Sequence, residues 1–255
     1  MSLPFEPVVF GIPLNVHLIL EYLAFFIAFR YYVYLRKKNA DLISTSNRLS
    51  IIIGAVFGAL ILSRGVALLE NPVLHSEQGW WALWNNKTIM GGLFGGLLGV
   101  ELSKKIIGEH RSSGDLFTLP IILGIGIGRI GCFLSGTTEF TYGVVTDSGL
   151  GMDLGDGLAR HPIALYELVF LLFLFGYMQW LWKKRRLLKN GDLFKLFMVS
   201  YFSFRFFIEF IKPNVFYVFG LSSIQLLCLI CLVYYHRFIV RTCTNTLPRD
   251  KPTRH

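Results

Sequence analysis

Long apolar stretches constrain this chain more than any other feature of its sequence. A helix needs about 20 apolar residues to cross the hydrocarbon core of a bilayer, and seven stretches come close to that length. The 255 residues are 53% hydrophobic and only 16% charged, with a mean hydropathy of +0.53, which is too apolar for a soluble domain of this size. We therefore predict an all-α integral membrane protein in which residues 1–255 form a single polytopic domain. The predicted spans are residues 14–35, 50–69, 89–107, 116–135, 163–182, 194–211 and 216–236.

Positive charge is concentrated in alternate connections between these stretches. The formal net charge is +9, and a strongly basic chain can indicate a nucleic-acid partner. Most of the lysines and arginines instead follow the first, third, fifth and seventh spans, as the positive-inside rule predicts for cytoplasmic segments. We predict an amino terminus outside the cell, a cytoplasmic carboxyl terminus with a basic tail over residues 237–255, and no nucleic-acid partner.

The four cysteines form no recognisable disulfide framework or metal site. Cys228 and Cys231 lie three residues apart in an apolar stretch, but the sequence places no second pair of ligands near them. Buried packing is the favoured interpretation for such cysteines. We predict neither a metal ion nor a cofactor.

Ionisable residues inside five of the predicted spans fall at one depth. With about 1.5 Å of rise per helical residue, they lie roughly 6 to 10 Å below the predicted outer surface. A charged side chain inside the bilayer is costly, so each of them needs a partner or a function. The residues of this layer are Glu21, Arg64, Arg129, Tyr166, Glu167, Arg205 and Glu209.

Two interpretations of this layer remain open. Three arginines and three carboxylates could simply neutralise one another between helices. Alternatively, the arginines could bind an anion, and a neighbouring polar loop that contains Glu139 favours this second interpretation. Because a guanidinium can donate two parallel hydrogen bonds to a phosphate, a phospholipid headgroup is the anion that we expect at this depth.

Four motifs resemble those of the prolipoprotein diacylglyceryl transferase family in order and spacing. The resemblance covers about residues 10 to 236, including the predicted seven spans. The arginine-centred motif and the His-Pro-x-x-Leu-Tyr-Glu motif are the specific ones, whereas a glycine-rich stretch alone is weak. The motifs are "GGLFGGLLG" (91–99), "GRIGCFLSG" (128–136), "RHPIALYE" (160–167) and "YFSFRFFIEFIKP" (201–213).

The resemblance implies an enzyme of the bacterial cytoplasmic (inner) membrane. It would move the diacylglyceryl group of phosphatidylglycerol, or of another anionic phospholipid, to the lipobox cysteine thiol of an exported precursor. Arg129 and Arg205 would be catalytic and would bind the phosphate. The further phosphate-binding residues would be Arg64, Tyr201, Gly136 and Gly143, and the supporting residues would be Tyr166, Glu167, Glu209 and Glu21.

The sequence departs from the family pattern at several positions. Met90 stands where the family commonly has a histidine that is proposed as the general base. Cys132 and Ser135 replace two asparagines, and Thr137 replaces a glutamate, with Glu139 as a possible displaced acid. The general base must take the proton of the acceptor thiol, because the thiolate is the nucleophile.

The candidate bases are His161, His17, Glu139 and Lys87, of which we expect His161 and Glu139 to be catalytic. Each has a simpler alternative role: His161 could cap a helix, His17 could anchor the chain at the membrane surface, and Glu139 could be solvated. Three functional hypotheses therefore stand. The chain is a diacylglyceryl transferase, a divergent relative with another acceptor, or a non-catalytic lipid-binding protein or transporter.

Overall fold

The computed structural model describes residues 3–39, 41–70, 86–184 and 189–246, so residues 247–255 of the predicted basic tail lie outside the described residues. Helices dominate the described chain. They are α1 (Val16–Lys38), α2 (Thr45–Glu70), α5 (Ile89–Ile107), α6 (Asp115–Leu134), α7 (Ile163–Lys183), α8 (Asp192–Ile208), α9 (Ser223–Tyr234) and α10 (His236–Thr246).

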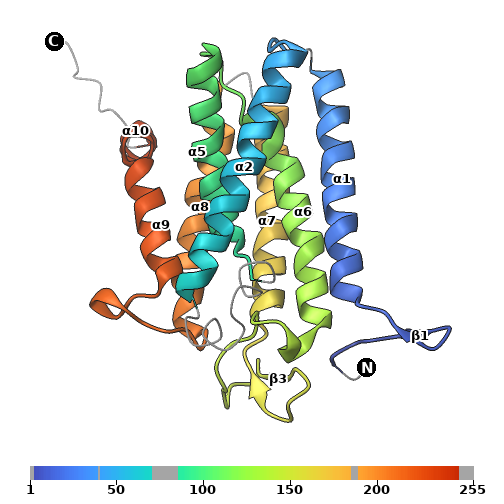
Figure 1. Cartoon of the computed structure of the whole chain (residues 1–255). Coiled ribbons are helices and arrows are strands. Elements are labelled where there is room, and N and C mark those ends of the chain that lie inside the picture. The colour runs from blue at the N-terminus through green and yellow to red at the C-terminus, as the bar shows by residue number, and fades with distance from the viewer. Residues whose placement is uncertain (1–2, 40, 71–85, 185–188, 247–255) are drawn as a thin grey trace.

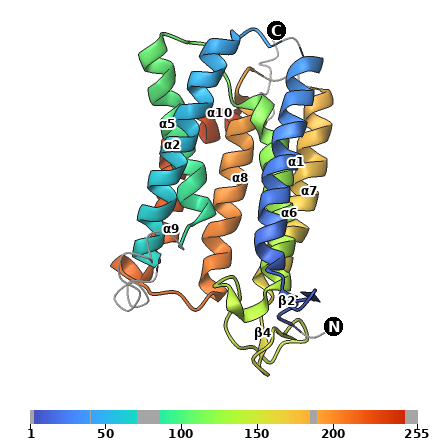
Figure 2. The same cartoon turned by 45° about the vertical axis from the view of Figure 1, so that its right-hand side comes forward.

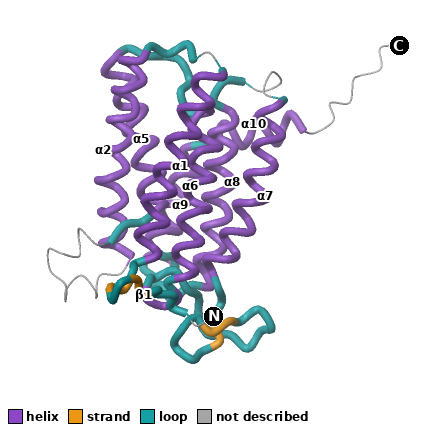
Figure 3. Tube along the Cα trace, turned by 90° about the vertical axis from the view of Figure 1, so that its right-hand side faces the viewer, coloured by secondary structure: helices purple, strands orange, loops and turns teal. Residues whose placement is uncertain are grey.

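Strands and 3-10 helices are short. Strand β1 (Val8–Val9) pairs antiparallel with β2 (Ile12–Pro13), and β3 (Met152–Asp153) pairs antiparallel with β4 (Ala159–Arg160). The 3-10 helices are η2 (Gly136–Thr138), η4 (Glu209–Ile211) and η5 (Val218–Gly220). Figure 3 shows that the strands are confined to one end of the helical bundle. The prediction of an all-α membrane protein is confirmed.

The helices form a bundle with two different ends. Helix α6 packs between α1 and α7, and α2 packs along α5 (Figure 1). Figure 2 shows α8 between these two groups. We call the end where α1, α5 and α7 finish the basic end, because Lys38, Lys104, Lys105 and Lys183 lie there. The opposite end, which carries the strands and the connection from α6 to α7, is the loop end.

The core of the bundle lies around α8. Phe197, Met198 and Phe202 on this helix are fully buried and pack with side chains of α6, α7 and α9. Cys228 and Cys231 on α9 are also fully buried in this cluster, which agrees with the packing role predicted for them. The bundle thus surrounds one helix, α8, with apolar side chains from its neighbours.

Large apolar side chains also cover the outside of the bundle. Phe25 on α1 is 69% exposed, and Phe173 on α7 is 77% exposed. Among the described residues, four helices (α1, α2, α6 and α7) are long and apolar enough to cross a membrane, and α9 with α10 would make a fifth. Helix α5 carries Glu101 and two lysines near its end, and α8 has only 17 residues. Seven spans and their orientation therefore remain predictions.

The structure departs most from the prediction at the last span. Residues 216–222 form a connection that contains η5 instead of the start of an α-helix, because Phe219 and Gly220 take positive φ angles of 56° and 67°. Ser222 then forms a capping box with Gln225 and starts α9. At the other end, α10 leaves α9 at an angle of 60°. The first ten residues of the predicted tail, 237–246, are therefore helical.

Helices α2 and α5 pack closely because glycines face each other. A Cβ atom on Gly58 would lie 2.2 Å from the carbonyl oxygen of Gly95, and one on Gly99 would lie 2.0 Å from that of Gly54. These residues are spaced four apart on each helix, which is the small-xxx-small arrangement of membrane helix pairs. The glycine-rich motif at 91–99 therefore serves at least helix packing.

Substitution of Gly58 by alanine should destabilise the protein by about 1–3 kcal/mol, because the new methyl group would overlap the α5 backbone. Thermal unfolding in detergent measures this effect. Gly65→Ala on the same helix is the matched control, since nothing lies within 4 Å of a Cβ at Gly65. There alanine should stabilise the helix by about 0.5–1 kcal/mol. Equal effects of the two substitutions would contradict the close approach.

Candidate active site

One buried carboxylate joins three helices near the loop end of the bundle. Glu167 on α7 lies 2.8 Å from Nε of Arg129 on α6 and 2.7 Å from Nη1 of Arg205 on α8. The Tyr201 hydroxyl, also on α8, donates a hydrogen bond to the same carboxylate. All four side chains are at least nine-tenths buried, and Glu167 is fully buried. The spacing of four between Tyr201 and Arg205 places both on one face of α8.

The network continues from Arg205 toward α2. Arg205 Nη2 donates to Glu209 in η4, one turn further along the chain. Lys212 Nζ lies 3.9 Å from Glu209 Oε2 and 3.0 Å from Oε1 of Glu70, the last residue of α2. Asn214 also donates to the Glu209 carboxylate. Four helices or their ends thus contribute to one line of alternating charges.

Desolvation explains why these charges are paired. A buried charge without a partner costs several kcal/mol, so a carboxylate and an arginine are stable here only together. The pairing agrees with the interpretation of mutual neutralisation between helices. It is nevertheless incomplete, because the buried Nε of Arg205 has no hydrogen-bond partner among the described residues. An unused guanidinium donor in a buried position is the feature expected where an anion binds.

A second line of polar groups meets Arg129 from the other side. Arg129 Nη1 lies 3.7 Å from the Cys132 Sγ atom, and His17 Nε2 on α1 lies 3.6 Å from the same sulfur. His17 Nδ1 in turn lies 3.4 Å from Glu139 Oε1 in the connection after η2. A carboxylate, an imidazole, a thiol and a guanidinium therefore follow one another. This is the order in which a carboxylate orients a histidine that acts on a thiol.

His161 has a different set of partners. Its Nδ1 atom lies 3.0 Å from the Tyr166 hydroxyl, and its backbone carbonyl accepts a hydrogen bond from Gly143 N at 2.9 Å. A hydrogen bond from Arg160 to Asp156 also stabilises the connection from α6 to α7, and it lowers the pKa of the Asp156 carboxyl. Among the described residues, no hydrogen bond of His161 reaches Arg129 or Arg205. The structure thus brings His161 and Tyr166 together at the loop end, beside the network.

The two glycines predicted to bind phosphate have close backbone neighbours. A Cβ atom on Gly136 would lie 2.1 Å from the carbonyl oxygen of Leu154, and Gly136 has a φ of +56°. At Gly143 it would lie 2.6 Å from His161 Cβ and 2.9 Å from the Ile211 carbonyl oxygen. Both positions therefore require glycine for the packing of the loop. A direct contact of either glycine with phosphate stays a prediction.

The remaining predicted residues lie around the network. Glu21 on α1 forms an ion pair with Lys87, which makes Lys87 a less available base. Arg64 lies partly buried on α2, the helix that contributes Glu70 to the network. Met90 is 1% exposed and packs in the apolar core, so its position offers no proton acceptor.

Sequence reasoning missed three members of the network. They are Lys212, Glu70 and Asn214, none of which the sequence analysis singles out. Lys212 is 4% exposed, because Glu70 and Glu209 neutralise its charge from two sides. The one available signal was the spacing of three between Glu209 and Lys212, which places both on one side of a helical turn. Glu70 carried no signal, because its partner is 142 residues away.

Comparison with known proteins places this arrangement in a family. Residues 7–241 match the model of the prolipoprotein diacylglyceryl transferase family. A phosphatidylglycerol-prolipoprotein diacylglyceryl transferase of Dehalococcoides mccartyi is 28% identical over 214 residues, which are 78% of this chain and 81% of the relative. The enzyme of the same name from Wolbachia pipientis wMel is 31% identical over 222 residues, which are 81% of this chain and 82% of the relative.

These similarities confirm the transferase hypothesis and do not favour the divergent or non-catalytic alternatives. They also agree with the apolar helices, because the family is one of bacterial membrane enzymes. The chain therefore belongs to the prolipoprotein diacylglyceryl transferase family and is a membrane-bound transferase.

Proposed function

We propose that the chain transfers the diacylglyceryl group of phosphatidylglycerol to the lipobox cysteine thiol of exported prolipoproteins. The reaction would take place at the loop end of the bundle, on the outer side of the bacterial inner membrane. In this proposal the chain crosses the membrane seven times, with its amino terminus outside and its carboxyl terminus in the cytoplasm. The uneven distribution of lysine and arginine between the two ends supports this orientation.

One observation carries the proposal: a guanidinium and an imidazole face the same point. Arg129 Nη1 and His17 Nε2 lie 3.7 Å and 3.6 Å from the Cys132 sulfur. Sulfur is a weak hydrogen-bond acceptor, so a phosphate oxygen would be a much better partner for Arg129. A phospholipid phosphate and an acceptor thiol bound near this sulfur would meet a cation and a base together.

We assign different roles to the two arginines. Arg129 would bind the phosphate directly and stabilise the negative charge that grows on it. Arg205 has both Nη atoms engaged by Glu167 and Glu209, so only its Nε is available to the phosphate. Its second role would be to hold Glu167, which in turn orients Arg129. Tyr201 supports the same carboxylate.

The transfer is a displacement at carbon. The base takes the proton of the acceptor thiol, and the sulfur then forms a bond to the glycerol carbon that carries the phosphate ester. The bond between this carbon and the ester oxygen breaks, and glycerol phosphate leaves with the electron pair. The base later gives its proton to the leaving phosphate or to water. Diacylglyceryl thioether and glycerol phosphate are therefore formed in equal amounts.

A reconstituted assay tests the proposed function. Purified protein is mixed with labelled phosphatidylglycerol and a lipobox peptide, and mass spectrometry follows the thioether and glycerol phosphate. We expect both products from the native chain and neither from Arg129→Ala. Arg30→Ala, an exposed arginine on α1, is the control and should retain activity. Absence of product from folded native protein would overturn the proposed acceptor chemistry.

The general base is tested by comparing two histidines. We expect His17→Gln to lower kcat about 100-fold, because general-base catalysis contributes on this scale. Glu139→Gln should cause a smaller loss, since Glu139 acts through His17 at 3.4 Å. His161→Gln is the matched control and should change kcat little, because its Nδ1 partner is Tyr166. The opposite order of the two histidine variants would assign the base to His161.

A further inference from the structure

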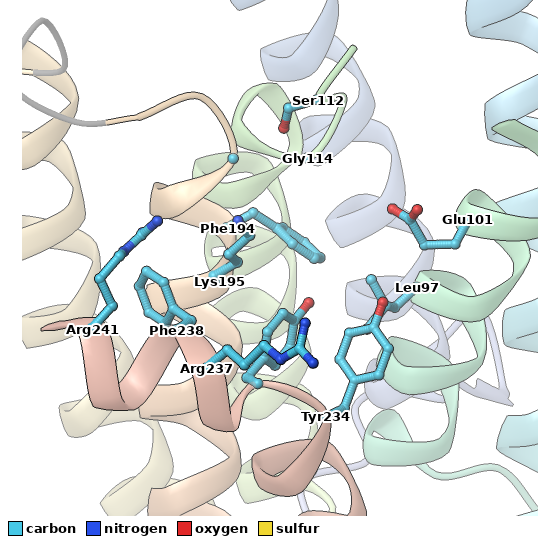
Figure 4. A pocket seen from close by; sticks show the side chains of 12 residues that line it. Leu97, Glu101, Ser112, Gly114, Phe194, Lys195, Tyr234, Arg237, Phe238 and Arg241 are labelled. Carbon is cyan, nitrogen blue, oxygen red and sulfur yellow. The ribbon is translucent and has the colours of Figure 1, made fainter. Parts of the chain in front are cut away.

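A second polar cavity lies at the basic end, away from the arginine network. Its volume is about 430 Å³, and its walls come from α5, α8, the end of α9, α10 and the residues before α6. The bend of 60° between α9 and α10 forms it, because α10 turns away from the direction of α9 near the start of α8. Figure 4 shows the side chains that line this cavity.

Positive charge prevails in the cavity. Three basic side chains line it (Lys195, Arg237 and Arg241), but only one acidic side chain, Glu101. Glu101 is already paired, since Lys104 Nζ lies 3.4 Å from its carboxylate. The surplus of positive charge predicts an anionic ligand.

The basic side chains differ in how they are engaged. Arg241 Nη2 lies 2.6 Å from Asp192 Oδ2, and Lys195 Nζ lies 3.5 Å from Oδ1 of the same residue. Asp192 therefore fixes α10 against the start of α8 and orients both cations. Arg237 has no hydrogen bond or ion pair among the described residues, and Figure 4 shows it extended toward Tyr234. One guanidinium is thus available for a ligand, and two further cations lie beside it.

The other walls of the cavity are apolar and aromatic. Four such side chains line it: Leu97, Phe194, Tyr234 and Phe238. A ligand that fits both kinds of wall has an anionic group next to a hydrocarbon part, as a phospholipid has. Helix α10 also has the composition of a helix that lies in a membrane surface, with Phe238, Ile239 and Val240 between two arginines.

We propose that this cavity binds the phosphate of an anionic phospholipid from the leaflet at the basic end. Arg237 is the main donor, and Arg241 and Lys195 add charge. The bound lipid would hold α10 against α5 and α8. This site is separate from the arginine network at the loop end, so the proposal does not depend on which reaction that network performs. A free phosphate ester offers the same phosphate chemistry as the headgroup and is a distinct outcome of the test.

Hydrogen exchange of α10 tests the proposal, because it reports on this helix and not on the loop end. The full chain is reconstituted in nanodiscs of phosphatidylglycerol or of phosphatidylcholine. We expect slower exchange over residues 236–246 in phosphatidylglycerol. Arg237→Gln should reduce this difference about fivefold, the effect of one basic residue at an anionic surface. Lys105→Gln, an exposed charge at the same end but outside the cavity, should leave it unchanged.

Four results would overturn the proposal. The first is equal exchange of α10 in both lipids, and the second is full protection in Arg237→Gln. The third is an equal loss of protection in Lys105→Gln, which would mean general surface attraction. Glycerol phosphate added to phosphatidylcholine nanodiscs separates the two sources of phosphate. If glycerol phosphate alone slows the exchange of α10, the cavity binds a free phosphate ester, and the lipid proposal is overturned. Retained transfer activity shows that Arg237→Gln is folded.

Discussion

Replacement of Arg129 by lysine should lower kcat/KM about 10²- to 10³-fold while the protein remains folded. Lysine keeps the positive charge and can still pair with Glu167, which lies 2.8 Å from Arg129 Nε. It cannot donate to the carboxylate and to a phosphate in fixed directions at the same time, as the planar guanidinium does. The expected loss is that of one donor to developing negative charge. Steady-state transfer to the lipobox peptide measures it.

The control for this substitution is Arg30→Lys, which changes an exposed arginine of α1 in the same way. It should leave kcat/KM unchanged. Native turnover by Arg129→Lys would contradict the role of Arg129 as a phosphate ligand. In that case a positive charge alone would suffice at position 129, which is what the interpretation of mutual neutralisation predicts.

Replacement of Glu167 by glutamine should both destabilise the protein and abolish transfer. The carboxylate is fully buried and lies between two arginines. Its loss leaves Arg129 and Arg205 as neighbouring buried cations, and breaking a buried pair in this way costs about 3–5 kcal/mol. Thermal unfolding in detergent measures the change in stability. Glu101→Gln is the control, because the Glu101 carboxylate is exposed and pairs with Lys104 on the same helix.

The double variant Arg129→Gln, Glu167→Gln separates the two interpretations of the network. In the double variant the buried cation at position 129 is removed together with its carboxylate. Part of the stability lost in Glu167→Gln should therefore return. Transfer activity should not return, because the phosphate ligand is then also missing. Recovery of both stability and activity would mean that the pair serves only to join α6 and α7.

The helices could largely be predicted from the sequence. All seven predicted spans contain a helix, because a chain in a bilayer must satisfy its backbone hydrogen bonds locally and helices do so. The start of the last span could not be predicted from hydropathy. Residues 216–222 are as apolar as a helix requires, but the capping box of Ser222 and Gln225 and the contact of Gln225 with the Phe206 carbonyl start the helix later.

The site was predictable by depth but not by pairing. Arg129, Glu167 and Arg205 were predicted to lie in one layer, and the structure joins them through Glu167. His17 and Glu139 appeared in the sequence only as separate candidate bases. Their contact depends on how α1 lies against α6, which no local pattern specifies.

The sequence by itself determined the family, the membrane helices and the ionisable residues within these helices. Apolar length, charge asymmetry and motif spacing are local properties of the chain, so they can be recognised without coordinates. The tertiary structure decided which charge meets which: Glu167 with both arginines, His17 with Cys132 and Glu139, and Lys212 with Glu70. These partners lie on different helices and far apart in sequence. Their pairing follows from helix packing, because desolvation leaves a buried charge stable only where the packed bundle brings its partner within a few ångströms.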